Sequence, residues 1–581
     1  MTASLNTDDL TPAAKAMRNA ATLLVVRDAS AGLEVLMLQR PERAGDLYSG
    51  ACVFPGGVVE EGDRRLYDLC QGVDDYAASA RLGLPEHGLA YFVAAIRECF
   101  EEAGLLFACG GDGQLPDLGA MATERLAEMR QRLGADADHL RQICADAQLR
   151  LAVDRLAYHS HWLTPPGVPK RFDTRFFLAL APSAQVVRSD GSEALRHYWL
   201  KPQQALDRAR EFKLRTATQQ TLQALLPFAS AAACLAHARQ PRPIELLMPR
   251  RALAASGPCT VAPDAAAYAE IARLDPEGRG DVHCEIQYDH PVRLSPRVIR
   301  LTAPNGNVMT GPGTNSYLLG GGERNEWAVI DPGPEIDGHV QHLLAAAPGA
   351  IRWVLVTHTH RDHSPAAALL KSLTGAQLLG LDTPSEEWPN SPFEPDQVLV
   401  HGDRVCIGEA TTLRVIHTPG HASNHLCYLL EEEQTLFTGD HIMQGSSVVI
   451  TPPDGDMAAY LDSLHALLGE DLAWLAPGHG HLMGPAHKVI HKTIAHRLMR
   501  ENKVLCALQD LAPVAIDGLL PCVYDDVAQH KHPMARRSLL AHLLKLQSEG
   551  RAREENGLWL LEGEGSGGGN APGSLLHGPS K

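Results

Sequence analysis

Three histidines and an aspartate fall within one short segment, THTHRDH at residues 357–363. The segment directly follows the apolar run Trp353–Val356, which predicts a buried strand. A strand that ends in such a cluster directs several ligands at one place. Imidazole together with carboxylate suits zinc-like ions.

Three downstream fragments follow the same plan: TPGH (418–421), TGD (438–440) and PGHG (477–480). Each places one ligand after an apolar run and beside a glycine that permits a turn. Seven ligands are what two adjacent ions need if they share a water. Chance grouping in a chain with 28 histidines is the alternative, but it does not explain four ordered fragments. The candidate ligands are His358, His360, Asp362, His363, His421, Asp440 and His479.

This H-x-H-x-D-H pattern resembles the signature of the metallo-β-lactamase superfamily. The resemblance implies an αββα fold with two zinc ions, for which manganese or iron are alternatives, and a catalytic role for Asp362. Two such ions lower the pKa of a bridging water and stabilise a developing oxyanion. The implied ligands are His358, His360 and His421 for the first ion, Asp362, His363 and His479 for the second, and Asp440 as the bridge.

A second acidic pattern, RECFEEAGL, lies at residues 97–105. Glu98, Glu101 and Glu102 stand at i, i+3 and i+4 and share one face of a predicted helix. Such clustered oxygen ligands suit Mg²⁺ or Mn²⁺ bound with a diphosphate, and Arg97 can hold a carboxylate in place. An exposed acidic helix face is the alternative interpretation.

Together with FPGGVVEEGD at residues 54–63, this pattern resembles the Nudix box. The resemblance implies an α/β/α sandwich, binding roles for Gly57 and Arg97, and hydrolysis of a nucleoside-diphosphate-X bond. Asp63 stands where the box has its first Glu, and 33 residues (64–96) separate it from Arg97 instead of seven. That insertion is similar to a subgroup that includes coenzyme A diphosphatases, so a CoA-like substrate is the first candidate.

We predict a multidomain chain of α/β and α+β class. The expected parts are a Nudix domain (15–230), a connector rich in Pro, Arg and Gly (231–294), a metallo-β-lactamase-fold domain (295–494), a winged-helix-like domain (495–562) and a flexible tail (563–581). The last domain is predicted to begin with a helix at about 495–511 and to end in a small hairpin.

The composition of the chain bears on its binding partners and its cellular compartment. The net charge is −17, which excludes a global electrostatic footprint for nucleic acid. The twelve cysteines form no C-x-x-C pair, which favours a reduced cytoplasm, and we expect no signal peptide. No apolar run is long enough to predict a membrane span, so we expect no membrane partner.

These features predict a two-headed, metal-dependent hydrolase acting on small-molecule diphosphate and thioester substrates. Two reactions remain as alternatives for the C-terminal head. One is glyoxalase-II-like thioester hydrolysis, and the other is cleavage of RNA, as in β-lactamase-like endoribonucleases. The alternative is a Nudix module that senses a nucleotide and regulates a ribonuclease. RNA could contact the C-terminal basic residues, and self-association is left open. The basic residues are Lys531, Arg536, Arg537, Lys545, Arg551 and Arg553.

Overall fold

The computed structural model describes residues 17–30, 32–44, 49–118, 123–133, 138–168, 170–384, 389–445 and 447–562. The predicted tail, 563–581, lies outside these residues. The chain divides into two compact units. The first comprises the residues up to Ala265 together with Asp275–Val282, and the second comprises Ala266–Leu274 and the residues from His283 onward.

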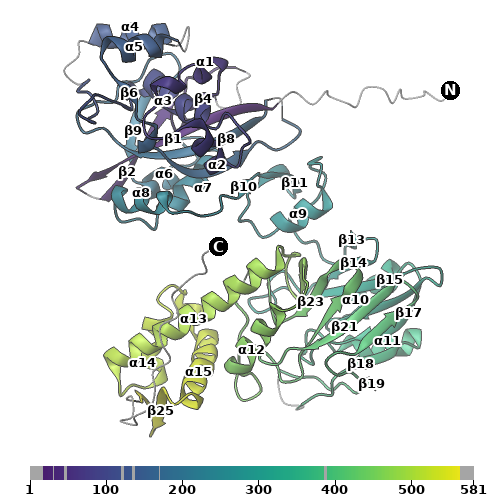
Figure 1. Ribbon diagram of the computed structural model, residues 1–581. Helices are drawn as coiled ribbons and strands as arrows, with labels where there is room; N and C mark the ends of the chain where they lie inside the picture. The colour runs from purple at the N-terminus through teal and green to yellow at the C-terminus, as the bar shows by residue number, and fades with distance from the viewer. Residues whose placement is uncertain are drawn as a thin grey trace, which may run out of the picture. The chain divides into compact units, whose positions relative to one another are not determined.

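A mixed sheet with the strand order β10-β7-β8-β1-β2-β3 forms the centre of the first unit (Figure 1). Strand β4 pairs with β1, and β9 pairs with β2. Successive side chains of β1 enter two different cores, Leu23 and Val25 one, Leu24 and Val26 the other, because side chains alternate along a strand. The strands are β1 (Arg18–Ala29), β2 (Gly32–Gln39), β3 (Cys52–Val53), β4 (Gly56–Val58), β7 (Ala157–Leu163), β8 (Phe172–Leu180), β9 (Arg196–Leu200) and β10 (Leu246–Leu247).

Helices cover both faces of this sheet, which confirms the predicted α/β/α sandwich. One core lies under α3, whose buried face includes Phe92 and Phe100, and the other lies under α6, α7 and α8. The helices of the unit are α1 (Glu61–Arg64), α2 (Asp75–Leu82), α3 (Leu89–Ala103), α4 (Thr123–Leu133), α5 (His139–Asp146), α6 (Pro202–Asp207), α7 (Thr216–Leu225) and α8 (Ala231–Arg239). Two small two-stranded sheets, β5 (Ala108–Cys109) with β6 (Arg150–Leu151) and β11 (Arg250–Ala254) with β12 (Gly257–Val261), and the 3-10 turns η1 (Tyr67–Leu69) and η2 (Val153–Arg155) complete it.

The stretch predicted as a connector contributes elements to both units. Helix α8 packs on the first sheet, and β10 extends that sheet by pairing with β7. Helix α9 (Tyr268–Leu274) belongs to the second unit. The apolar residues of the predicted connector are spread among polar and basic ones, so the composition of this stretch did not reveal its helices and strands. The domain boundaries drawn from the sequence stay predictions.

Two sheets form the second unit, with a shared core between them and helices outside, which is the predicted αββα arrangement. Alternation again divides the side chains: Leu426 and Tyr428 of β22 enter the shared core, whereas Cys427 and Leu429 face the helices. The first sheet contains β13 (Val292–Ser295), β14 (Val298–Thr302), β15 (Asn315–Gly321), β16 (Glu326–Ile330), β17 (Ala350–Leu355), β18 (Gln377–Gly380) and β19 (Gln397–Val398). The second contains β20 (Arg404–Ile407), β21 (Thr411–His417), β22 (Leu426–Leu430), β23 (Thr435–Gly439) and β24 (Trp474–Pro477), and the turn η3 (Glu431–Glu433) joins β22 to β23.

Helices α10 (Asp337–Ala346) and α11 (Ala366–Thr374) pack on the first sheet, and α12 (Met457–Leu467) and α13 (Ala486–Leu511) pack on the second. Helix α13 begins nine residues before the predicted start at 495. Ala486, Ile490 and Ile494 explain the difference, because their spacing of four places all three in the core beneath the helix.

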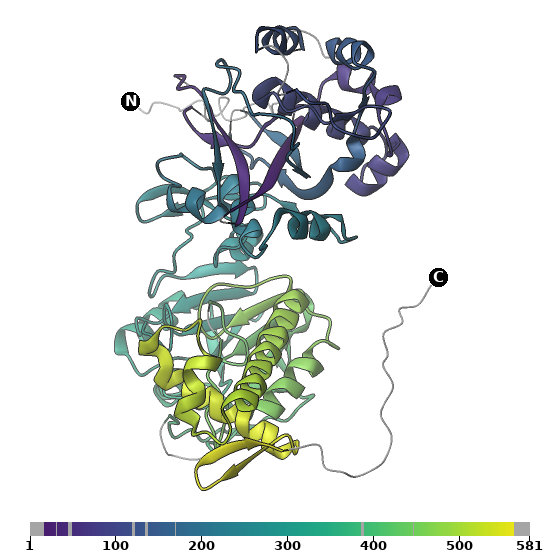
Figure 2. The ribbon, with the colours of Figure 1, turned by 90° about the vertical axis from the view of Figure 1, so that its left-hand side faces the viewer.

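The predicted winged-helix-like fold is confirmed. It contains α14 (Ile516–Val523), the turn η4 (Gln529–Lys531), α15 (His532–Ser548) and the antiparallel hairpin β25 (Ala552–Glu555) and β26 (Leu558–Leu561). Their core includes Leu543 and Trp559. With α13 they form the C-terminal segment (486–561), which lies beside α12 and away from α10 and α11 (Figures 1 and 2). Across the described ranges, no helix is both long enough and apolar enough to cross a bilayer.

Candidate active sites

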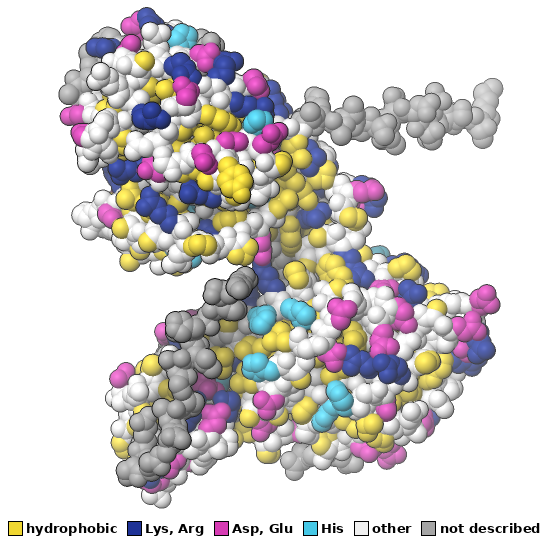
Figure 3. Space-filling view, viewed as in Figure 1, with side chains coloured by type: hydrophobic (Ala, Val, Ile, Leu, Met, Phe, Trp, Pro, Cys, Tyr) yellow, Lys and Arg dark blue, Asp and Glu magenta, His cyan; other side chains and the backbone are white. Residues whose placement is uncertain are grey.

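The seven predicted ligands of the second unit meet where strands end. His358 and His360 follow β17, His421 follows β21, Asp440 follows β23 and His479 follows β24. Histidine side chains are visible on the surface of this unit in Figure 3. Among the ligand histidines, His358, His363 and His479 are at most 1% exposed, whereas His360 and His421 are partly exposed.

The described residues contain two groups of side chains close enough to hold an ion. In the first, His360 Nδ1 lies 2.9 Å from His358 Nε2 and 3.0 Å from His421 Nε2. Burial, followed by the neighbouring His421, lowers the pKa of His360 to about 3. The ring is therefore neutral at physiological pH, which is the form that binds metals.

The second group contains Asp362, His363, Asp440 and His479. Asp440 Oδ1 lies 3.2 Å from His479 Nε2 and 3.4 Å from His363 Nε2. Its other oxygen, Oδ2, lies 3.7 Å from His421 Nε2, a member of the first group. Asp440 therefore stands between the two groups, as a bridging ligand would.

Two buried atoms of this group lack a hydrogen-bond partner, Nε2 of His363 and Oδ1 of Asp440. Burial opposes ionisation of Asp440, yet His479 and His363 hold its pKa well below the usual value. Unpartnered, buried imidazole and carboxylate atoms facing one another are a donor set that a divalent cation satisfies. The residues present thus fit the metal ions that the fold family implies.

The outer nitrogens of the ligand histidines are held by fixed acceptors. His363 Nδ1 donates to Asp331 Oδ2 at 2.8 Å, and His479 Nδ1 donates to the carbonyl of Gly313 at 3.0 Å. His421 Nδ1 donates to the carbonyl of Val449 at 2.9 Å. Such bonds fix the tautomer and the orientation of each ring.

Sequence reasoning missed Asp331 and His425 as site residues. Asp331 also accepts bonds from the backbone N–H and the hydroxyl of Thr357, so it fixes the start of the ligand loop. The backbone N–H of Asp440 donates to His425 Nε2 at 3.2 Å. The only signal in the sequence was a polar residue after an apolar strand, Val329-Ile330-Asp331, and a second histidine four residues after His421.

In the first unit, Arg97 of α3 links the two halves of the Nudix-like pattern. Its Nε and Nη2 donate to Asp63 at 2.8 and 3.1 Å, and its Nη1 donates to Glu98 at 2.8 Å. Arg97 and Asp63 are 2% and 0% exposed. The inserted residues 64–96 therefore form an excursion whose two ends, next to Asp63 and Arg97, lie in contact. They contain α2 and the first half of α3.

Glycines allow the chain to approach the acidic helix face, defined as Glu98, Glu101 and Glu102. A Cβ on Gly57 would lie 2.3 Å from a carboxylate oxygen of Glu98. The backbone N–H of Gly56 donates to Glu102 at 3.0 Å. These contacts place the FPGG turn directly against the acidic face, as the resemblance implied.

Burial and mutual repulsion raise the pKa values of this face. Burial first, and Glu98 second, raise the pKa of Glu101 to about 7, and the same causes raise the pKa of Glu102 well above its usual value. In the described part of the chain the three carboxylates do not form one of the close groups that could hold an ion. A cation that drew them together would relieve their repulsion.

The predicted basic residues of the C-terminal segment are largely paired with carboxylates. Lys545 lies 2.9 Å from Glu501 and 2.6 Å from Glu549. Further pairs join Arg536 to Asp517 at 2.6 Å, Arg551 to Glu549 at 3.2 Å and Arg553 to Glu555 at 2.9 Å. This pairing reduces the positive field available to a phosphate backbone.

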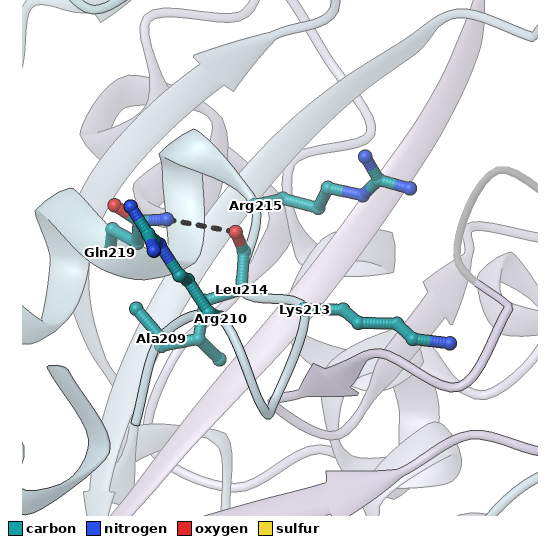
Figure 4. A pocket seen from close by; sticks show the side chains of 6 residues that line it. All are labelled: Ala209, Arg210, Lys213, Leu214, Arg215 and Gln219. Atoms are coloured by element: carbon teal, nitrogen blue, oxygen red, sulfur yellow. Dashed lines mark hydrogen bonds between the residues drawn. The ribbon is translucent and has the colours of Figure 1, made fainter. Parts of the chain in front are cut away.

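A cavity of about 570 Å³ in the first unit contains none of the predicted site residues. It is lined by residues around the start of α7, among them Arg210, Lys213 and Gln219, which donates to the carbonyl of Leu214 (Figure 4). The charged ends of Arg210 and Lys213 point to opposite sides in this view, so they do not converge on one anion.

Comparison with known proteins finds a matching family model in both units of the chain. The metallo-beta-lactamase superfamily matches residues 309–479, the NUDT19 Nudix domain matches residues 73–223, and the beta-lactamase associated winged helix domain matches residues 516–559. The fold and the clustered histidine and aspartate side chains are those of a hydrolase with a candidate metal site. The chain belongs to the metallo-β-lactamase superfamily, and it is a hydrolase that carries a Nudix domain and a winged-helix domain in addition.

Three relatives each match part of the chain. A beta-lactamase-like protein 2 homolog of Drosophila melanogaster is 30% identical over 276 residues, which is 45% of this chain and 91% of that protein. An atrochrysone carboxyl ACP thioesterase of Aspergillus chevalieri is 33% identical over 38% of this chain and 68% of its own. A lactamase-like protein of Pestalotiopsis microspora is 34% identical over 37% of this chain and 65% of its own.

Proposed function

We propose that the chain is a two-headed metallohydrolase whose C-terminal head cleaves a thioester and whose Nudix head cleaves a nucleoside-diphosphate-X bond. The observation that carries the first part is the position of Asp440. One of its oxygens faces His479 and His363, and the other faces His421. That placement suits a carboxylate that joins two ions.

When bound, two divalent ions would supply a water of lowered pKa and would polarise the carbonyl to be attacked. His358, His360 and His421 would hold one ion, and Asp362, His363 and His479 the other. Burial opposes ionisation of Asp362, but His363 and His479 together lower its pKa to about 2. Such a weak base suits a cation ligand better than a proton acceptor.

A loop beside the ligands supports an apolar substrate. Gly313 accepts the bond from His479, and Val308 and Met309, a few residues before it, are 63% and 41% exposed. Met309 lies four positions before Gly313, at most about 14 Å of extended chain. The side chain of Asn307 accepts a bond from the N–H of Met309 at 2.7 Å, which forms a local turn in the backbone of the loop at these two residues.

This surface suits the acyl part of a thioester better than an RNA strand. RNA would need unpaired cations and stacking groups near the ligands, whereas Lys545, Arg536 and Arg551 are paired with carboxylates. The thioesterase name of the Aspergillus chevalieri relative supports the same choice.

For the Nudix head, Glu98, Glu101 and Glu102 would bind Mg²⁺ or Mn²⁺, with Arg97 and Gly57 positioning them. A carboxyl of pKa about 7, as at Glu101, is suited to exchange protons with a water near neutral pH. The intact carboxylates argue against a head that only senses a nucleotide. Acyl-CoA is the first substrate to test, because it contains both a thioester and a diphosphate.

The experiment is to incubate the purified chain with acyl-CoA, CoA, S-lactoylglutathione and single-stranded RNA, each with Zn²⁺, Mg²⁺ or a chelator. We expect release of free thiol from acyl-CoA with Zn²⁺ and of a phosphorylated adenosine product with Mg²⁺. RNA cleavage that weakens sharply with salt, without thioester cleavage, would contradict the proposal for the C-terminal head. CoA left intact under every condition would remove it from the candidates of the Nudix head.

A further inference from the structure

Residues 447–450, here the bracing loop, lie between a metal-ligand histidine and the C-terminal segment. His421 Nδ1 donates to the carbonyl of Val449 at 2.9 Å. This is the hydrogen bond that sets the plane of the His421 ring, and its Nε2 faces His360 on the other side. The loop therefore acts on the ligand group through one carbonyl.

The residues on either side of Val449 are fixed by the C-terminal helices. Arg497 of α13 donates from Nη2 to the carbonyl of Val448. The backbone N–H of Ile450 donates to the hydroxyl of Ser538 on α15 at 3.3 Å. Val448 and Ile450 are 3% and 0% exposed, so water cannot replace either bond.

A second route joins Arg497 to the same centre. Its guanidinium lies 5.0 Å from the ring centroid of Tyr460, and the hydroxyl of Tyr460 donates to the carbonyl of His441 at 2.8 Å. His441 directly follows Asp440 in the chain. Arg497 is 3% exposed and thus fixed between the bracing loop and α12.

We infer that α13 and α15 position His421 through the bracing loop, so that the winged-helix part completes the metal centre. Ser538 and Arg497 are positioning residues, because they contact the peptide units around Val449 and no ligand atom. The inference rests on the proposed metal site. It gives the winged-helix fold a role that requires no nucleic acid.

Metal binding by the full-length chain tests this. Apo-protein is titrated with Co²⁺, and the visible absorption of each bound ion reports its ligand geometry. Ser538→Ala removes the hydroxyl that accepts the bond from the N–H of Ile450, and it should weaken one of the two Co²⁺ sites by up to about tenfold and alter its absorption bands. Loss of a direct partner of a ligand residue costs roughly 10–100-fold in affinity, and Ser538 acts one step further out, through the peptide unit beside Val449. The other site should keep its affinity.

Ser548→Ala is the matched control, since Ser548 lies on the same helix and donates only to the carbonyl of Lys545. His421→Ala marks the spectrum of a chain that lacks the affected site. Arg497→Met, which keeps the volume and removes the donor, should resemble Ser538→Ala. Wild-type affinities and spectra in both folded variants would overturn the inference. A wild-type chain that binds no Co²⁺ would overturn the metal site itself.

Discussion

Replacing Asp63 with Asn tests whether the 33-residue insertion leaves the Nudix-like site intact. Asp63 and Arg97 contact each other through two bonds, of 2.8 and 3.1 Å, and both side chains are almost fully buried. The variant keeps the shape and removes the charge, so the buried guanidinium loses one carboxylate. Breaking a buried pair by removing one partner costs about 3–5 kcal/mol.

The lower end of that range applies here, because Glu98 still pairs with Arg97 at 2.8 Å. For a unit of this size each kcal/mol lowers Tm by roughly 2–4 °C, so about 3 kcal/mol corresponds to about 6–12 °C. The assay is calorimetry of the transition of the first unit, together with diphosphate hydrolysis, which should fall because Arg97 also orients the acidic face.

Glu42→Gln is the control, since Glu42 pairs with Lys213 at 2.9 Å but is exposed. It should leave Tm unchanged. If Asp63→Asn also leaves Tm and diphosphate hydrolysis unchanged, Asp63 does not close the Nudix-like pattern and the assignment of the insertion is wrong.

Three further outcomes are expected. Glu102→Gln should lower diphosphate hydrolysis by at least about 100-fold with the fold retained, because it removes a charge that the cation needs, and unchanged turnover would leave the acidic face merely structural. Mg²⁺ affinity, measured by calorimetry at pH 6 and pH 8, should rise with pH, because the protonated forms of Glu101, whose pKa is about 7, and of Glu102, whose pKa is also raised, cannot bind a cation, and Glu101→Gln should weaken this dependence. The double variant Val308→Ser with Met309→Ser should raise KM about tenfold for a long-chain acyl thioester and leave KM for a short-chain acyl thioester unchanged. Equal effects on the two KM values would exclude an acyl-binding role for the loop.

The sequence predicts the ligands better than it predicts what holds them. His358, His421 and His479 each follow an apolar strand, so pattern and spacing locate them. Asp331 was not recognised because its partner His363 is 32 residues away and no local pattern links the two. Folding alone reveals such a contact, because the ends of neighbouring strands meet at one edge of a sheet.

The contacts that the predicted connector makes beside the ligands also could not be predicted from the sequence. Glu270 of α9 accepts bonds from Arg300 and, at 2.7 Å, from the N–H of Leu482, three residues after His479. The connector reads as polar and irregular, and one buried glutamate within it carries no periodic signal. The acidic helix face could be predicted from the spacing of its members, whereas its raised pKa values depend on burial that the sequence does not show.

The most direct test of the central claim is the metal content and thioesterase activity of the wild type and of Asp440→Asn, after expression with zinc, iron and manganese supplied. We predict about two transition-metal ions per wild-type chain. Asp440→Asn should retain fewer ions and lose acyl-thioester hydrolysis, while diphosphate hydrolysis persists because the acidic helix face belongs to the other unit. A wild-type chain without bound transition metal, or an Asp440→Asn variant with full thioesterase activity, would contradict the proposed site.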